Sequence, residues 1–211
     1  DSNIIPKAPC SIIFNGRSGS GKTVLLSNLL HKPHLYKGYY DLIYLFSGSP
    51  DDIFDNLDIK KANMYTDVKQ WDAKLKAIMN KQKADIKGKG IHKSKSVLLI
   101  FEDCINHQSF MKRSPYFTKL FIANRHYNVS TWITSQSWTR LPRVCRINTN
   151  AIYYFKGTVG ETDLLIDEYS PAALTKQEFR QLLNYAVDDD YCFLSIYNKL
   201  HDRERYRKCL S

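Results

Sequence analysis

The chain has 211 residues, of which 43% are hydrophobic, and this suits one α/β domain with a sizeable core. No apolar stretch approaches the ~18 residues that a transmembrane helix needs, so we expect no membrane span. The net charge of +10 favours a polyanionic partner but does not identify it.

Strand and helix patterns alternate along the sequence. Residues 10–15 predict a buried strand, 22–31 a helix that ends before Pro33, and 42–46 a second strand. An acidic loop with a short helix is expected at 50–58, a helix at 67–85, a mobile glycine- and lysine-rich loop at 87–95 and the most apolar strand at 97–101. The remaining elements are, in order, a helix at 109–124 interrupted by Pro115, strands at 129–134 and 151–155, helices at 161–168 and 171–185, and a last strand at 191–197.

This order of elements predicts an α/β fold with a mostly parallel sheet and helices on both faces. We expect a single domain over residues 1–211, with its core at about 10–200 and a basic tail at 201–211. Ligands of such sheets bind at the carboxyl ends of the strands, and the main motifs described below follow predicted strands.

Residues 16–23 match the phosphate-binding motif G-x-x-x-x-G-K-[ST] at every fixed position. The motif consists of Gly16, Arg17, Ser18, Gly19, Ser20, Gly21, Lys22 and Thr23. Small residues let the backbone curl so that its N–H groups point at phosphates, and the following helix adds the positive end of its dipole. We expect Lys22 to reach the β- and γ-phosphates of ATP and the Thr23 hydroxyl to bind Mg²⁺. A plain glycine-serine turn is the alternative, but it gives the Lys-Thr pair no purpose.

An acidic pair, Glu102 and Asp103, directly follows the apolar strand at 97–101. This is the Walker B pattern, in which one carboxylate serves Mg²⁺ and the other polarises the attacking water. By position Glu102 serves the metal and Asp103 the water, although the usual order of acids is different and the roles could be reversed. The alternative is a pair of solvated acids in a turn.

A glutamine and several arginines flank the strand at 129–134. Gln136 follows this strand and could sense the γ-phosphate or its attacking water, although a glutamine there is more often a simple loop residue. Arg125 precedes the strand and is the candidate arginine finger, which a ring neighbour would supply to stabilise the transferring phosphoryl group. Arg146 is a possible sensor or finger, and Arg140 and Arg143 compete for that role; all four arginines could instead belong to a basic surface.

Together these motifs resemble the genome-packaging ATPases of large DNA viruses, including the poxvirus type, and of their virophages, within the FtsK/HerA superfamily. The resemblance rests on GRSGSGKT, VLLIFEDC, NRHYNVSTWITSQSW and LPRVCRINTN and spans about residues 12–155. It implies a RecA-like core in which the strand before Gln136 lies between the strands that carry the other two motifs. It also implies a ring, usually hexameric, that drives double-stranded DNA into a preformed capsid at a capsid or portal vertex.

Residues 74–95 are rich in lysine and suit contact with DNA phosphates of any sequence. The candidate contacts are Lys87, Lys89, Lys93 and Lys95, and a solvated helix face and loop is the alternative. The five cysteines are far apart and form no CxxC pair, which argues against a zinc site or a disulfide framework. They favour an intracellular setting, which the resemblance narrows to the host cytoplasm or a viral factory, with association with the virion also possible.

Three other functions compete with a packaging motor. The first is a P-loop kinase acting on a nucleotide or small molecule, but neither an arginine-bearing lid nor an acceptor pocket can be identified. The second is a non-enzymatic nucleotide switch, which two candidate catalytic acids argue against. The third is an FtsK/HerA-type DNA translocase that takes no part in packaging.

Overall fold

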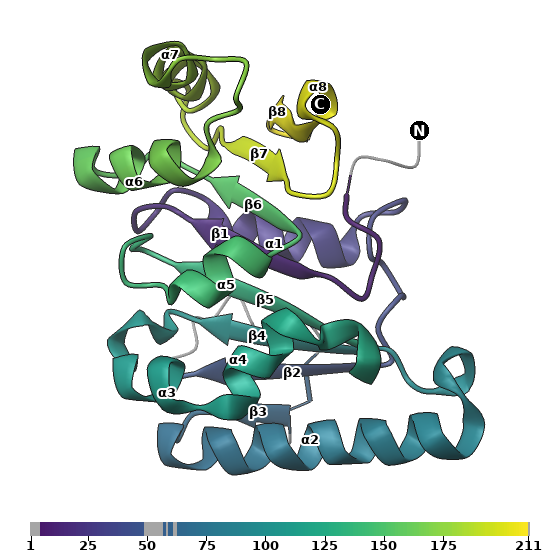
Figure 1. The fold of residues 1–211 in the computed structure, drawn as a ribbon. Helices are drawn as coiled ribbons and strands as arrows, with labels where there is room; N and C mark the ends of the chain where they lie inside the picture. Colours follow the sequence, from purple (N-terminus) through teal and green to yellow (C-terminus); the bar gives the residue numbers. More distant parts are fainter. Residues whose placement is uncertain (1–4, 49–56, 58, 61–62, 211) are drawn as a thin grey trace.

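The computed structural model describes residues 5–48, 57, 59–60 and 63–210. Most of the loop and short helix expected at 50–58 therefore lie outside the described residues. The described part forms one eight-stranded sheet in the order β3-β2-β4-β5-β1-β6-β7-β8, with helices on both faces (Figure 1). This architecture confirms the predicted α/β class.

The sheet is parallel from β3 to β6, and β7 and β8 join it antiparallel. The strands are β1 (Ser11–Asn15), β2 (Leu42–Ser47), β3 (Met64–Tyr65), β4 (Val97–Glu102), β5 (Val129–Ser135), β6 (Ala151–Tyr154), β7 (Leu194–Tyr197) and β8 (Tyr206–Lys208). The six predicted strands are all present. The two that the sequence did not predict, β3 and β8, are short edge strands whose few residues carry no clear alternation. The expected basic tail thus contributes β8 to the sheet.

Helices occupy most of the connections between strands. They are α1 (Lys22–His31), α2 (Val68–Lys89), α3 (Gln108–Arg113), α4 (Pro115–Ile122), α5 (Arg143–Asn148), α6 (Val159–Tyr169), α7 (Lys176–Ala186) and α8 (Asp202–Arg205), with 3₁₀ turns η3 (Ile91–Lys93), η4 (Cys104–Asn106) and η5 (Asn124–Tyr127). The short α5 and α8 were not predicted. The interruption expected at Pro115 is real, because Pro115 begins α4 and the Ser114 hydroxyl caps that helix by accepting from the Phe117 N–H.

Two helix boundaries correct the prediction. The segment expected to be a mobile loop from residue 87 is still helical through Lys89, because lysines are good helix formers and one glycine in a helix costs only about 1 kcal/mol. The helix ends only at Gly90, whose φ of 81° is a conformation that glycine favours. At the other boundary, α7 begins at Lys176 rather than 171 because Thr175 forms a capping box with Glu178.

Each central strand is buried on both faces of the sheet. Along β4, Val97, Leu99 and Phe101 contribute to one core cluster, whereas Leu98 and Ile100 contribute to the other. The first cluster packs under α2 and α4–α7 and the second under α1, in agreement with Figure 1. No helix in the described part of the chain combines the length and the apolar character needed to cross a membrane.

The strand order fixes where the motifs meet. β5 lies between β1 and β4, which confirms the position expected for the strand before Gln136. Because β1, β4 and β5 run parallel, the residues that follow all three strands lie along the same edge of the sheet.

Candidate functional site

The phosphate-binding loop connects β1 to α1 and is tied to β5 at its start. The Gly16 N–H donates to the Ser135 carbonyl at 3.0 Å, and the Ser20 N–H donates to the Arg17 carbonyl at 3.3 Å, which curls the loop. A Cβ on Gly16 would lie 2.5 Å from the Cβ of Phe155, so no side chain fits at this position. The tight curl expected from the sequence is therefore present.

The amino end of α1 opens onto this loop without a side-chain cap. Gly21 is the N-cap, with φ at 96°, and no acidic residue occupies the first turn. The N–H groups at a helix start lack partners within the helix, so this end is suited to an anion. Thr23 lies half-buried in the same first turn.

Lys22 is only 8% exposed, and its ammonium group is directed into the loop. Its Nζ donates to the carbonyl oxygens of Gly16 at 2.9 Å and Arg17 at 2.7 Å. These contacts hold the ammonium in the concave side of the loop, where a bound phosphate oxygen could take the place of a carbonyl.

The acidic pair at the end of β4 has two distinct environments. Glu102 is 7% exposed, and its Oε2 accepts a hydrogen bond from the Ser47 hydroxyl at 2.7 Å. Asp103 has a left-handed backbone, with φ at 43°, and its N–H donates to Thr134 Oγ1 at 3.3 Å. Among the described residues, Asp103 Oδ1 is buried and makes no hydrogen bond.

The oxygen atoms at this site suit Mg²⁺, which shares its ligands between protein and substrate, better than a metal that is bound by protein side chains alone. No cluster of three or more His, Cys, Asp or Glu side chains that could hold a metal occurs among the described residues. Mg²⁺ is normally bound through one or two carboxylates and completes its shell with substrate phosphates and water. The unpartnered oxygen of Asp103, the Glu102 carboxylate and the Thr23 hydroxyl fit that pattern.

Gln136 directly follows the residue that holds the start of the phosphate-binding loop. It comes immediately after Ser135, whose carbonyl accepts from Gly16, and its side chain is exposed. The turn beyond it is fixed because the Ser135 hydroxyl accepts from the Ser137 N–H at 3.2 Å and donates to the Ser137 carbonyl at 2.9 Å. The expected sensor is thus presented from a rigid turn beside the loop.

Arg125 lies at the opposite end of the sheet from the phosphate-binding loop of its own chain. It is exposed in η5, just before β5 begins, whereas the loop contacts the end of β5. The seven residues of β5 span about 20 Å. Arg125 therefore cannot contact a nucleotide in its own chain. Of the competing arginines, Arg140 and Arg143 are exposed at the loop end.

Arg146 is held in a buried ion pair. Its Nη1 donates to Glu168 Oε1 at 2.7 Å and Oε2 at 2.6 Å, and the arginine is 7% exposed. Trp138 completes the cluster, because its Nε1–H donates to Glu168 at 3.2 Å and its ring lies 5.7 Å from the guanidinium. No local pattern in the sequence predicts this cluster, because Glu168 is 22 residues from Arg146 along the chain. A sensor or finger role for Arg146 would require the pair to open.

The candidate DNA-binding lysines are all exposed, but they belong to different elements. Lys87 and Lys89 lie on α2, Lys93 on η3 and Lys95 just before β4. They occupy the same end of the sheet as Arg125.

A buried glutamine fixes the two segments that carry these basic residues. Gln82 is 3% exposed, and its Nε2 donates to the Lys95 carbonyl at 2.8 Å and to the Tyr127 carbonyl at 2.9 Å. The backbone before β4 and the end of η5 are therefore both held by the side chain of one residue on α2.

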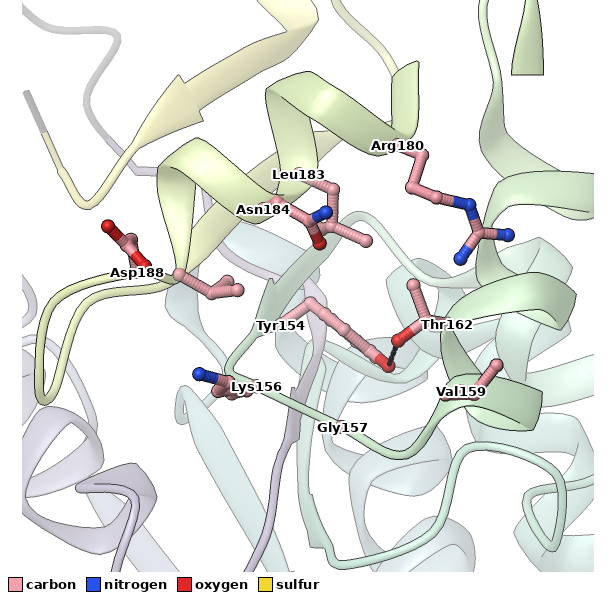
Figure 2. A pocket seen from close by; sticks show the side chains of 10 residues that line it. Tyr154, Lys156, Gly157, Val159, Thr162, Arg180, Leu183, Asn184 and Asp188 are labelled. Atoms are coloured by element: carbon pink, nitrogen blue, oxygen red, sulfur yellow. Dashed lines mark hydrogen bonds between the residues drawn. The ribbon is translucent and has the colours of Figure 1, made fainter. Parts of the chain in front are cut away.

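Two neighbouring hollows lie next to the phosphate-binding loop. The smaller, of about 210 Å³, is lined by Gly19 and Ser20 of the loop, by Phe155 and Lys156, and by residues 187–192. The larger, of about 440 Å³, lies between the end of β6 and helices α6 and α7. Figure 2 shows Lys156 and Asp188 at one end of the larger hollow and Arg180 at the other, with Tyr154 hydrogen-bonded to Thr162 between them. The two hollows share Lys156, Val187 and Asp188. Sequence reasoning missed both.

A family model described as Poxvirus A32 protein matches residues 1–211. Among curated proteins, no sequence relative matches the chain. The fold is similar to that of the genome packaging NTPase B204 from Sulfolobus turreted icosahedral virus 2. In its ATP-gammaS complex the TM-score is 0.63 at 15% identity, over 95% of this chain and 96% of that one. In its AMPPCP complex the TM-score is 0.69 at 13% identity, over 97% and 98%. EssC (ATPases 2 and 3) from Geobacillus thermodenitrificans is similar at a TM-score of 0.64 and 13% identity, over 90% of this chain and 38% of that one.

Proposed function

The chain belongs to the Poxvirus A32 protein family, and from this premise we propose that it is an ATP-hydrolysing motor that drives double-stranded viral DNA into a preformed capsid. The work would be done inside an infected cell, in the host cytoplasm or a viral factory. The similarity of fold to B204, which is described as a genome packaging NTPase, supports this proposal.

One observation carries the proposal: three motifs for nucleotide chemistry meet at one edge of the sheet. The phosphate-binding loop follows β1, the acidic pair ends β4, and Gln136 follows the intervening β5. Phosphoryl transfer needs positioning and charge stabilisation more than covalent chemistry, and this arrangement can supply both.

Each part of the site has a proposed task. The loop amides and Lys22 bind the triphosphate of ATP, and the Thr23 hydroxyl and Glu102 hold Mg²⁺, which neutralises charge on the phosphates when bound. Asp103, with its unpartnered buried oxygen, accepts the proton of the attacking water, and Gln136 orients that water. The opposite assignment of the two acids remains an alternative, and Glu102→Gln and Asp103→Asn variants distinguish them. Loss of Mg²⁺ affinity identifies the metal ligand, and loss of turnover with normal affinity identifies the base.

A ring of copies would complete the site. Because Arg125 is about 20 Å or more from its own loop, we infer that it serves as a finger for the neighbouring subunit in a homo-oligomeric ring, which we expect to be a hexamer. Mixing Arg125→Ala with Glu102→Gln subunits tests this. Each variant alone should be inactive, and mixed rings should regain turnover at interfaces that carry both intact residues. Mixtures that stay inactive would contradict a finger acting between subunits.

The exposed lysines would provide the contact with DNA. Phosphate contacts are independent of sequence, which a motor that must move any DNA requires. Neutralising Lys87, Lys89, Lys93 and Lys95 should weaken binding equally for all duplex sequences and flatten its salt dependence. A loss confined to particular sequences would contradict backbone contact.

The decisive experiment measures phosphate release with and without long duplex DNA, together with the mass of the particle by light scattering. We expect hydrolysis that rises with DNA and with ring assembly, and that Lys22→Ala abolishes. Full activity of the Lys22→Ala variant would contradict the proposed ATP site. A phosphorylated small product in place of free phosphate would indicate a kinase.

A translocase outside packaging is the second candidate function. A similar fold occurs in EssC (ATPases 2 and 3), which is not described as a packaging protein, so the fold alone does not restrict the chain to packaging. Purified capsids separate the two functions, because only a packaging motor should make added DNA resistant to nuclease in their presence.

A further inference from the structure

The loop between α7 and β7 presents an unusual residue beside the phosphate-binding loop. Tyr191 has φ at 63° in a turn in which the Cys192 N–H donates to the Asp189 carbonyl at 3.2 Å. Glycine or asparagine is normal at such a position, and a bulky side chain there is strained. Tyr191 is also 71% exposed, so burial of its side chain does not account for the strain. Strain of this kind is concentrated at ligand-binding sites.

The Tyr191 side chain lies against the N-cap of α1. Its Cδ1 is 3.2 Å and its Cβ is 3.7 Å from the position that a Cβ on Gly21 would occupy. Val24, one turn further along α1, is 53% exposed. An exposed ring and an exposed apolar side chain therefore flank the place where the phosphate-binding loop becomes a helix.

The charged residues around the smaller hollow indicate how a nucleotide would be oriented in it. Its loop side has Gly19 and Ser20, next to the buried Lys22, whereas its far side has the carboxylates of residues 188–190. Lys156 also lines the hollow, but the three carboxylates outnumber it, which favours a nucleotide with its phosphates towards Lys22 and its uncharged nucleoside towards Tyr191. Asp189 is held by Lys208 at 2.9 Å, which fixes the turn that carries Tyr191.

We propose that Tyr191 is the platform on which the base of the bound nucleotide stacks. This rests on the proposed function, because it assigns the base end of the same nucleotide site. The volume of about 210 Å³ is smaller than the ~300–1,000 Å³ of sites for drug-sized ligands, and it suits the nucleoside part of a ligand whose phosphates lie in the loop. Carboxylates on the far side can accept hydrogen bonds from ribose hydroxyls.

The test compares the binding of ATP and of inorganic triphosphate to the full chain by calorimetry in the presence of Mg²⁺. Stacking of a base on an aromatic ring typically accounts for about 1–3 kcal/mol, so Tyr191→Ala should raise the Kd for ATP by about 5-fold to 150-fold. It should leave the Kd for inorganic triphosphate within about twofold, and Tyr191→Phe should restore ATP binding. Tyr185→Ala is the matched control, because Tyr185 is 69% exposed nearby and its ring contacts Lys208 at 4.4 Å.

A glycine variant separates binding from folding. Tyr191→Gly relieves the left-handed strain, so its melting temperature should equal or exceed that of the wild type, while ATP binding weakens as in Tyr191→Ala. An unchanged Kd for ATP in the alanine variant would overturn the inference. Equal losses for ATP and triphosphate would also overturn it, because the ring would then be shaping the loop. Failure of the wild type to bind either ligand would overturn the proposed function itself.

Discussion

The buried pair of Arg146 and Glu168 allows a sharp test of whether this arginine stabilises the fold or senses the nucleotide. The test uses three variants: Glu168→Leu, Arg146→Met and the double variant that carries both substitutions. The side chains are 9% and 15% exposed, and Glu168 also accepts from the indole of Trp138. Removing one partner of a buried pair costs about 3–5 kcal/mol, and the partial exposure places the single variants near 3 kcal/mol.

The double variant should lose much less free energy of unfolding than the two single variants lose together. It leaves no buried charge, and its remaining cost is the lost acceptor of the Trp138 indole N–H, about 1 kcal/mol. A loss of 3 kcal/mol corresponds to a fall in Tm of about 6–12 °C for a chain of this size. Thermal and urea unfolding of the three variants give the coupling free energy, and nucleotide binding by the folded proteins should remain close to that of the wild type.

The reasoning would be refuted by an Arg146→Met protein that is as stable as the wild type and binds ATP normally but has lost turnover. That result would return Arg146 to the role of sensor or finger. It would also mean that the pair with Glu168 opens when nucleotide binds.

Four further perturbations test other parts of the fold. Gly16→Ala should abolish nucleotide binding measured by calorimetry, because its Cβ would lie 2.5 Å from that of a buried phenylalanine; normal affinity would show that the loop can adjust. Thr175→Ala should lower stability by about 1 kcal/mol, seen as a fall of about 2–4 °C in Tm, through loss of the α7 cap. The pKa of Glu178 is lowered by the hydrogen bond from the Thr175 N–H. Its stabilising contribution should therefore be present above the ordinary carboxyl pKa and be lost as pH falls through the lowered one, which unfolding of Glu178→Gln at several pH values will check. Iodoacetamide should label Cys192 and Cys209 in the native protein and the other three cysteines only after unfolding, because those three are buried and burial raises the pKa of their thiols; mass spectrometry of the digest gives the answer.

The sequence predicted the central sheet and the phosphate-binding loop because both are encoded locally. A continuous apolar run such as Val97–Phe101 has few alternatives to a buried parallel strand. The loop at Gly16–Thr23 has fixed residues at fixed spacings, and it follows a strand and opens a helix, which is the context the motif requires. The order of strands came from the family resemblance, because local pattern does not determine which strands pair.

The features that sequence reasoning missed depend on contacts between distant residues or on conformation. Arg146 and Glu168 are separated by a strand and most of a helix, and nothing in either segment marks a pair. Tyr191 is an ordinary residue in the sequence, and only its positive φ and its contact with Gly21 set it apart. The sequence pattern predicts a helix end at residue 85 because glycines alternate with lysines from residue 87 on, whereas α2 continues to Lys89.

The amide of Gln82 joins two backbone segments at the end of the sheet opposite the phosphate-binding loop. Its nitrogen has two hydrogens, and both are engaged, one by the backbone at Lys95 and one by the backbone at Tyr127. The segment before β4 and the turn that presents Arg125 are thus joined by two hydrogen bonds that share one atom, in addition to the bonds that Asn128 Nδ2 donates to the Ser94 and Lys95 carbonyls. The segments on either side of this atom can move as a unit, and they can move apart only by leaving a buried donor unsatisfied.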